Sequence, residues 1–150
     1  ATLAFVWNPM KTAFLLVALA AAIPAASAAE PFCDTGKPHP IDLQLRRDLD
    51  QSGGVTVDIR EAQGTAYQGW DRELNREYRE LMALLSEADK PRLRDAQRAW
   101  LAFQEQEKAL WWSEISGDGG TLQPIVVSDI GLGFLRERVC RMARYKAALQ

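Results

Sequence analysis

The sequence has little histidine and little cysteine, and these shortages exclude several kinds of active site. His39 is the only histidine, and it stands between Pro38 and Pro40. Neither a Ser-His-Asp triad nor a multi-histidine metal site can therefore be built on a rigid element. We expect no catalytic residue, no metal and no cofactor.

Charge of one sign is not clustered either. The arginines are interleaved with Asp and Glu along the chain, and the formal net charge is −2. This spacing is typical of solvated helix faces, whereas a nucleic-acid surface needs a basic patch. With 47% apolar and 25% charged residues, the composition also excludes wholesale disorder and a polytopic membrane protein.

Long hydrophobic runs are absent, and the one short run has the context of a signal peptide. Residues 12–23 are apolar, follow Met10-Lys11 and precede Ala26-Ser27-Ala28. A spanning helix needs roughly 20 apolar residues, so an uncleaved anchor is the less favoured alternative. We expect residues 1–28 to be a leader and signal peptide (Met10 to Ala28), which makes the protein periplasmic or secreted without stable membrane insertion after cleavage. Cleavage would remove Lys11 from the 18 basic residues and none of the 20 acidic ones, leaving a net charge of −3.

The two cysteines, Cys33 and Cys140, are an even pair in an oxidising compartment. A disulfide between them would close a loop around nearly the whole domain. Two unpaired thiols are the alternative, because nothing in the sequence fixes the distance between the two residues.

Helical periodicity is what the chain has in abundance. Residues 29–40 contain three prolines and a glycine, which predicts an extended segment, and residues 41–49 predict a short helix that ends at Ser52-Gly53-Gly54. Apolar residues at steps of three and four then predict a long helix from about Thr56 to Leu85, with Gly64 and Gly69 as soft points. This stripe consists of Tyr67, Trp70, Leu74, Tyr78, Leu81 and Leu85.

Two more long helices complete the pattern. Pro91 suits a first helical turn, and the helix that it begins is expected to end at residues 116–120. Its predicted buried residues are Leu93, Ala96, Trp100, Phe103, Trp111 and Ile115. The last helix repeats helical spacing from Leu135 to Leu149, although residues 124–128 fit either its start or an extended segment. A linker of about five residues makes the second and third helices antiparallel. Residues 41–150 thus predict one all-α domain, a small antiparallel helical bundle of three long helices plus a short N-terminal helix.

Polar residues occupy places on these stripes where a plain core helix would be apolar. On helical geometry we expect a polar cluster of Asp71, Asn75, Gln97, Glu107 and Arg138. A buried arginine needs an acid, so Arg138 is expected to meet Glu107 or Asp71. We interpret the cluster as structural, because buried polar groups can fix which helix faces which. The alternative, a cell-wall hydrolase with Asp71 and Glu107 as its carboxylate pair, requires an open cleft between them.

The glycine-rich segment after the third helix predicts a recognition surface. It follows a helix, whereas a phosphate cradle would follow a strand, so a nucleotide site is disfavoured. Trp111 and Trp112 point about 100° apart on a helix, so Trp112 is either exposed or, as we expect, covered by the following loop. Loops on rigid bundles often carry recognition. The expected partner-binding surface consists of Trp112, Asp118, Gly119, Gly120 and Thr121.

The residues also resemble the LprI-type lysozyme inhibitor N-terminal domain family. The resemblance lies in an Asp-x-x-Leu-Asn-x-x-Tyr segment, a Leu-x-x-Ala-Gln-x-x-Trp-x-x-Phe segment, a glycine turn and a late arginine. The matching residues are Asp71, Leu74, Asn75 and Tyr78, then Leu93, Ala96, Gln97, Trp100 and Phe103, then Gly119, Gly120, Thr121 and Arg138. The chain departs from the family at Gln104, where an arginine is common, and at Arg46, Ala62 and Lys108, which stand near family cysteines.

The resemblance implies an exported helical domain, and the name of the family's founding member implies inhibition of lysozyme. Our hypothesis is therefore an exported, non-enzymatic binding protein that protects the cell envelope, with lysozyme or another envelope protein as its partner. A periplasmic structural or stress-related interaction module without lysozyme contact is the main alternative, and the hydrolase is the third.

Overall fold

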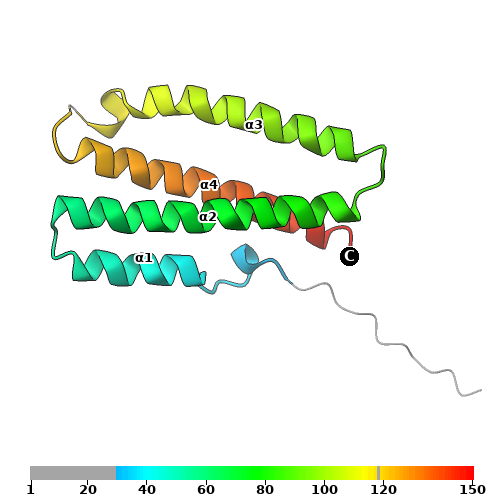
Figure 1. Ribbon diagram of the computed structural model, residues 1–150, viewed down its shortest axis with the longest axis horizontal. Helices are drawn as coiled ribbons and strands as arrows, with labels where there is room; N and C mark the ends of the chain where they lie inside the picture. Colours follow the sequence, from blue (N-terminus) through cyan, green and yellow to red (C-terminus); the bar gives the residue numbers. More distant parts are fainter. Residues whose placement is uncertain (1–29, 118) are drawn as a thin grey trace, which may run out of the picture.

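Four α-helices form the structure of the chain, a computed structural model that describes residues 30–117 and 119–150 (Figure 1). They are α1 (Pro40–Gln51), α2 (Thr56–Leu84), α3 (Lys90–Trp111) and α4 (Gln123–Ala147). The 3-10 turn η1 (Phe32–Asp34) precedes α1, and η2 (Glu114–Ser116) lies between α3 and α4. No strand occurs in these ranges, so the predicted all-α bundle of three long helices and one short helix is confirmed. The expected signal peptide and Asp118 lie outside the described residues.

The helices pack in the order α1, α2, α4, α3, with α2 and α4 as the central pair. Figure 1 shows that consecutive helices run in opposite directions, as the short linkers predict. The central pair therefore runs parallel, and α3 lies against α4 although it follows α2 in the sequence. Within the two described ranges, no helix is both long and apolar enough to cross a membrane.

Local sequence signals account for the helix ends. The helix predicted from Thr56 to about Leu85 runs from Thr56 to Leu84. Pro124 lies in the first turn of α4, so the ambiguous residues 124–128 are helical. The N–H of Ile41 donates to Nδ1 of His39 at 3.2 Å, so this histidine caps α1.

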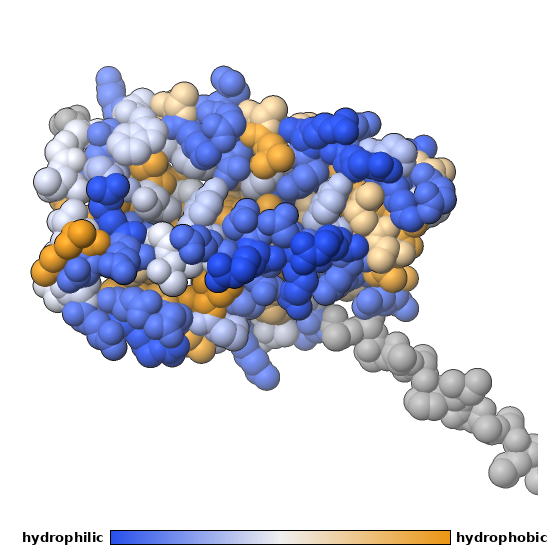
Figure 2. Space-filling view, in the orientation of Figure 1, coloured by the Kyte–Doolittle hydropathy of each residue, from blue (hydrophilic) through white to orange (hydrophobic). Residues whose placement is uncertain are grey.

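The core lies between α2 and α4. Trp70 is 1% exposed, and it packs with Leu74 and Leu81 against Leu135 and Val139 of α4. Burying a large apolar side chain stabilises a fold by about 1.5–3 kcal/mol, so the contact between α2 and α4 is a main source of stability. Polar side chains cover most of the face in Figure 2, which is the amphipathic pattern that the helical stripes predict.

The N-terminal segment is fastened to this core. Cys33 and Cys140 form a disulfide with their Cα atoms 5.8 Å apart, which settles the choice that the sequence left open. Asp34 accepts a hydrogen bond from Arg144 at 2.6 Å, and the ring of Phe32 lies 5.5 Å from that of Trp70. The segment expected to be extended thus contains a 3-10 turn held against α4.

The third helix is packed less deeply than its stripe predicts. Leu93 and Trp111 are buried, but Ala96 is exposed and Phe103 is 53% exposed. Ile115 is 61% exposed, because α3 ends at Trp111 and Ile115 falls in η2. The expectation that all of these residues are buried is wrong for Ala96, Phe103 and Ile115.

A narrow aromatic seam explains this difference. Phe134 of α4 has the rings of Trp100, Phe103 and Trp111 of α3 around it, at centroid distances of 5.4–5.6 Å. Because α3 lies on α4 and is not wedged between α4 and α2, only one edge of its stripe meets the core. The other edge borders a groove and the solvent.

Candidate functional site

Arg138 and Gln97 meet as the sequence predicts. Arg138 of α4 is 8% exposed, and its Nε donates to Oε1 of Gln97 on α3 at 3.0 Å. Its guanidinium carbon also lies 5.6 Å from the centre of the Trp100 ring. The two polar side chains therefore join α3 to α4 beside the aromatic seam.

The predicted acid for Arg138 is missing. Across the described ranges, no hydrogen bond or ion pair joins Arg138 to Asp71 or Glu107, so the predicted pairing is wrong. Nη2 of Arg138 is buried without a partner, and burial lowers the pKa of the guanidinium. Asp71 is exposed and instead accepts a hydrogen bond from Asn75 at 3.2 Å.

Helical geometry explains why Asp71 is absent from the seam. Trp70 points into the core, and the next residue on a helix points about 100° away from it. Glu107 is half-buried on α3. Among the described residues, no contact joins the carboxylates of Asp71 and Glu107. In the same part of the chain, no three His, Cys, Asp or Glu side chains are grouped as metal ligands would be.

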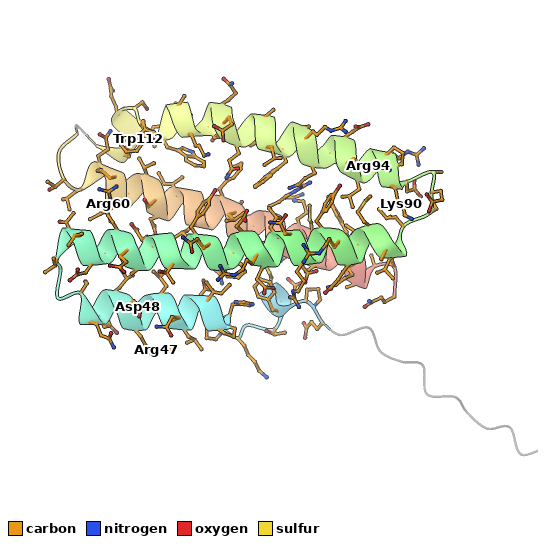
Figure 3. The ribbon with its side chains drawn as sticks, viewed as in Figure 1. Arg47, Asp48, Arg60, Lys90, Arg94 and Trp112 are labelled. Carbon is orange, nitrogen blue, oxygen red and sulfur yellow. A yellow bond between two sulfur atoms is a disulfide. The ribbon has the colours of Figure 1, made fainter. Side chains whose placement is uncertain are left out.

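The loop between α3 and α4 presents apolar side chains to solvent. Trp112 is 53% exposed, Ile115 61% and Leu122 68%, and we refer to these three residues as the loop-end patch. The expectation that the loop covers Trp112 is therefore wrong. Figure 3 shows Trp112 at the same end of the bundle as Arg60, opposite Lys90 and Arg94.

Glycines shape the loop beside this patch. Gly119 and Gly120 have φ angles of +95° and +82°, which other residues rarely adopt. Thr121 follows them and is exposed. The predicted surface residues 112 and 119–121 thus share one end of the molecule with Ile115, which the sequence predicts to be buried, and with Leu122.

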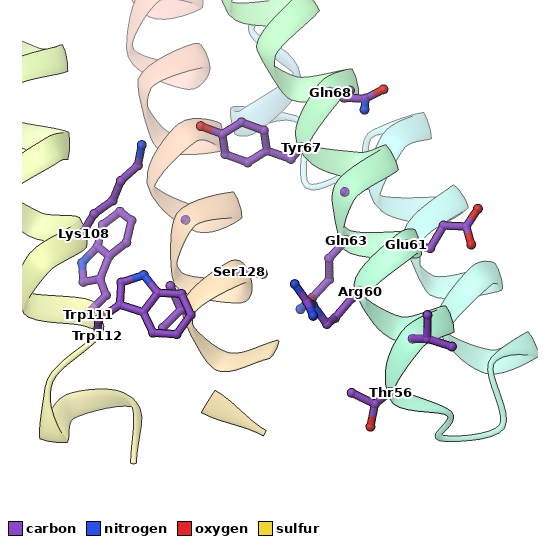
Figure 4. Close-up of a pocket in the computed structure, with 14 residues that line it drawn as sticks. Thr56, Arg60, Glu61, Gln63, Tyr67, Gln68, Lys108, Trp111, Trp112 and Ser128 are labelled. Carbon is purple, nitrogen blue, oxygen red and sulfur yellow. The ribbon is translucent and has the colours of Figure 1, made fainter. Parts of the chain in front are cut away.

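A groove that the sequence does not predict lies beside the patch. It has a volume of about 940 Å³ and is bounded by α2 on one side, the end of α3 on the other and α4 beneath (Figure 4). Its lining consists of Thr56, Val57, Arg60, Glu61, Gln63, Gly64, Tyr67, Gln68, Lys108, Trp111, Trp112, Val127, Ser128 and Gly131.

Two of the residues that line this groove are glycines. A Cβ atom added to Gly64 on α2 would meet nothing within 4 Å, and one on Gly131 of α4 would lie 3.6 Å from the Trp111 ring. In the sequence, Gly64 is visible only as a residue that weakens a helix. The missing signal is spatial, because the groove depends on α3 lying against α4 and away from α2.

The lining of the groove includes aromatic side chains and Gln63, which has a buried hydrogen-bond acceptor without a partner. Gln63 is 5% exposed, and its Nε2 donates to the carbonyl oxygen of Ile125 at 3.0 Å, while its Oε1 has no partner. Figure 4 shows the Trp111 and Trp112 side chains on one side, with Gln63 and Arg60 across from them. The ammonium group of Lys108 at the rim pairs with Glu105 at 2.7 Å.

One of three comparisons with known proteins, the one with family models, finds a match. No curated protein and no solved structure matches the chain. The family model described as lysozyme inhibitor LprI matches residues 48–141, which include α2, α3, the connecting loop and most of α4. Because that match covers more than half of the residues of the chain, the chain belongs to the LprI lysozyme inhibitor family.

Proposed function

We propose that this chain is an exported, non-enzymatic binding protein that inhibits lysozyme and so protects the cell envelope in the periplasm or outside the cell. The observation that carries the proposal is the family match over residues 48–141. The signal-like residues 10–28 and the disulfide both suit an oxidising exported compartment.

The loop-end patch is the proposed contact surface. Tryptophan is enriched among the residues that dominate binding energies, and clustered exposed apolar side chains mark interaction sites. Trp112, Ile115 and Leu122 meet this description, and each is more than half exposed. The net charge of −3 expected after cleavage adds a weak attraction toward a basic enzyme.

Inhibition of cell-wall lysis tests the function. Secreted protein, purified with its disulfide intact, is added in molar excess to several lysozyme types, and the clearing of a cell-wall suspension is followed. We expect slower clearing with at least one type, together with a saturable heat of binding in calorimetry. Unchanged clearing and no heat with every type would overturn the proposal.

The same material also tests the assignment as a non-enzyme. Without lysozyme, the protein is expected to leave the cell-wall suspension intact. Clearing that disappears in Glu107→Gln, with the helical content unchanged, would instead establish a hydrolase.

A further inference from the structure

We infer that the groove between α2, α3 and α4 is a carbohydrate-binding site for a short neutral oligosaccharide. This inference goes beyond lysozyme inhibition and does not rest on it. The groove is large enough to hold a small-molecule ligand. Its volume of about 940 Å³ lies near the upper end of the range for small-molecule sites, about 300–1,000 Å³.

The aromatic side chains match the apolar face of a sugar ring. Trp112 is half exposed and Tyr67 half-buried, so both have surface available, while Trp111 is buried beneath the groove. An aromatic ring packs its face against C–H groups, and a pyranose carries such groups on its faces and hydroxyls around its edge. A sugar stacked here would cover the exposed part of Trp112.

The polar side chains match the edge of the ring. Oε1 of Gln63 is a buried acceptor without a donor, and an unpaired buried acceptor costs about 1–3 kcal/mol. This atom is closed to solvent, so the Gln63 side chain must turn toward the groove before a hydroxyl or N-acetyl N–H of a sugar can donate to it, whereas a hydrocarbon chain would leave it unpaired. Ser128 and Gln68 offer both donors and acceptors on the same lining.

The charges favour a neutral ligand. The charged lining residues are Arg60, Glu61 and Lys108, of which Lys108 already pairs with Glu105. The remaining two, Arg60 and Glu61, carry opposite charges, so the lining has no cluster of one sign that would bind a phosphate-rich or a cationic ligand.

Gly64 allows the groove to be filled without damage to the fold. Because nothing lies within 4 Å of an added Cβ, Gly64→Leu is expected to fold, and leucine raises helix propensity by almost 1 kcal/mol over glycine. Gly133→Leu is the matched control, since Gly133 also has open space around it, lies on α4 and is not part of the groove.

The experiment titrates secreted protein with maltotriose and with the N-acetylglucosamine trimer, and in parallel with decanoate and with a short peptide. Binding is followed by tryptophan fluorescence and by calorimetry without lysozyme. We expect a saturable signal with at least one sugar. Gly64→Leu should weaken it at least tenfold and leave the melting temperature unchanged or higher, and Trp112→Phe should remove most of the fluorescence change. Gly133→Leu should bind as the wild type does.

Several outcomes would overturn the inference. These are no saturable signal with either sugar, sugar binding that Gly64→Leu does not weaken, and binding of decanoate or of a short peptide in the groove in place of sugars. Because no lysozyme is present, each of them leaves the inhibition proposal standing.

Discussion

Replacing Gln97 with Glu is expected to stabilise the protein, because it supplies the acid that Arg138 lacks. Arg138 is 8% exposed, and among the described residues its guanidinium makes one hydrogen bond, to Gln97 at 3.0 Å. Glutamate has nearly the shape of glutamine, so the substitution adds a charge without opening or filling a cavity. The effect on stability therefore reports the electrostatics of the seam.

The expected size follows from two opposing terms. Opposite unit charges about 4 Å apart attract by about 4 kcal/mol at an effective dielectric constant of about 20. Gln97 is half-buried, so the new carboxylate also loses part of its hydration, which costs a few kcal/mol. We expect a net gain of about 1–2 kcal/mol, or about 4–8 °C in melting temperature for a domain of this size.

Thermal unfolding of a double-mutant cycle measures this gain. Gln97→Glu should raise the melting temperature at pH 7, Arg138→Met should change it little because the uncompensated charge is also removed, and Gln97→Glu should lower it when position 138 is already methionine. The folded state should hold the pKa of the new carboxyl below its ordinary value of about 4.3. The gain is thus present above about pH 5 and lost as the pH falls through the folded-state pKa. Equal destabilisation by Gln97→Glu with and without Arg138 would refute the reasoning.

Three further predictions concern the N-terminal segment and a buried ion pair. Cys33→Ser with Cys140→Ser should lower the free energy of unfolding in urea by about 2–5 kcal/mol, because the bridge closes a loop with a sequence separation of 107; an unchanged urea midpoint would contradict this. Burial lowers the pKa of His39 from 6.5, against the opposing charges of Glu73 and Asp42, so its contribution to stability is fully present above about pH 6.5 and is lost as the pH falls through the folded-state pKa. His39→Asn, which can still cap α1, should flatten that part of the stability profile, and an unaltered profile would show that another group causes it. Glu77→Ala should cost about 2–3 kcal/mol, because Glu77 is 4% exposed and pairs with Lys146 at 2.7 Å, whereas Glu80→Ala at the exposed end of the same network should cost less than about 1 kcal/mol. Similar losses from the two variants would argue against this difference.

The sequence predicts the elements of this fold well because its helical stripes are long. The stripe from Tyr67 to Leu81 places α2 within one residue of its observed end. Buried polar residues were also informative, since Gln97 and Arg138 stand within apolar stripes and do meet. Local periodicity is sufficient for such predictions, because each depends on one helix and the face that it buries.

What the sequence does not predict depends on how α3 is placed. A stripe shows which side of a helix is apolar, but not which neighbour covers it. Because Phe134 draws α3 onto α4, Phe103 and Trp112 are exposed and the groove remains open beside α2. The missing acid at Arg138 has a different origin, since Asp71 follows the buried Trp70 on α2 and therefore lies on the exposed flank of that helix.

The loop-end patch provides the most direct test of the account as a whole. The measurement is the inhibition constant of the secreted protein against the lysozyme type that it inhibits best, for the wild type, Leu122→Asp and Leu101→Asp. Leu122 and Leu101 are both exposed, at 68% and 48%, but Leu101 lies in the middle of α3, away from the patch. Leu122→Asp should weaken inhibition at least tenfold, and Leu101→Asp should leave it within about twofold of the wild type, as expected when a few residues dominate an interface. Full inhibition by Leu122→Asp, or no inhibition by the wild type, would contradict the account.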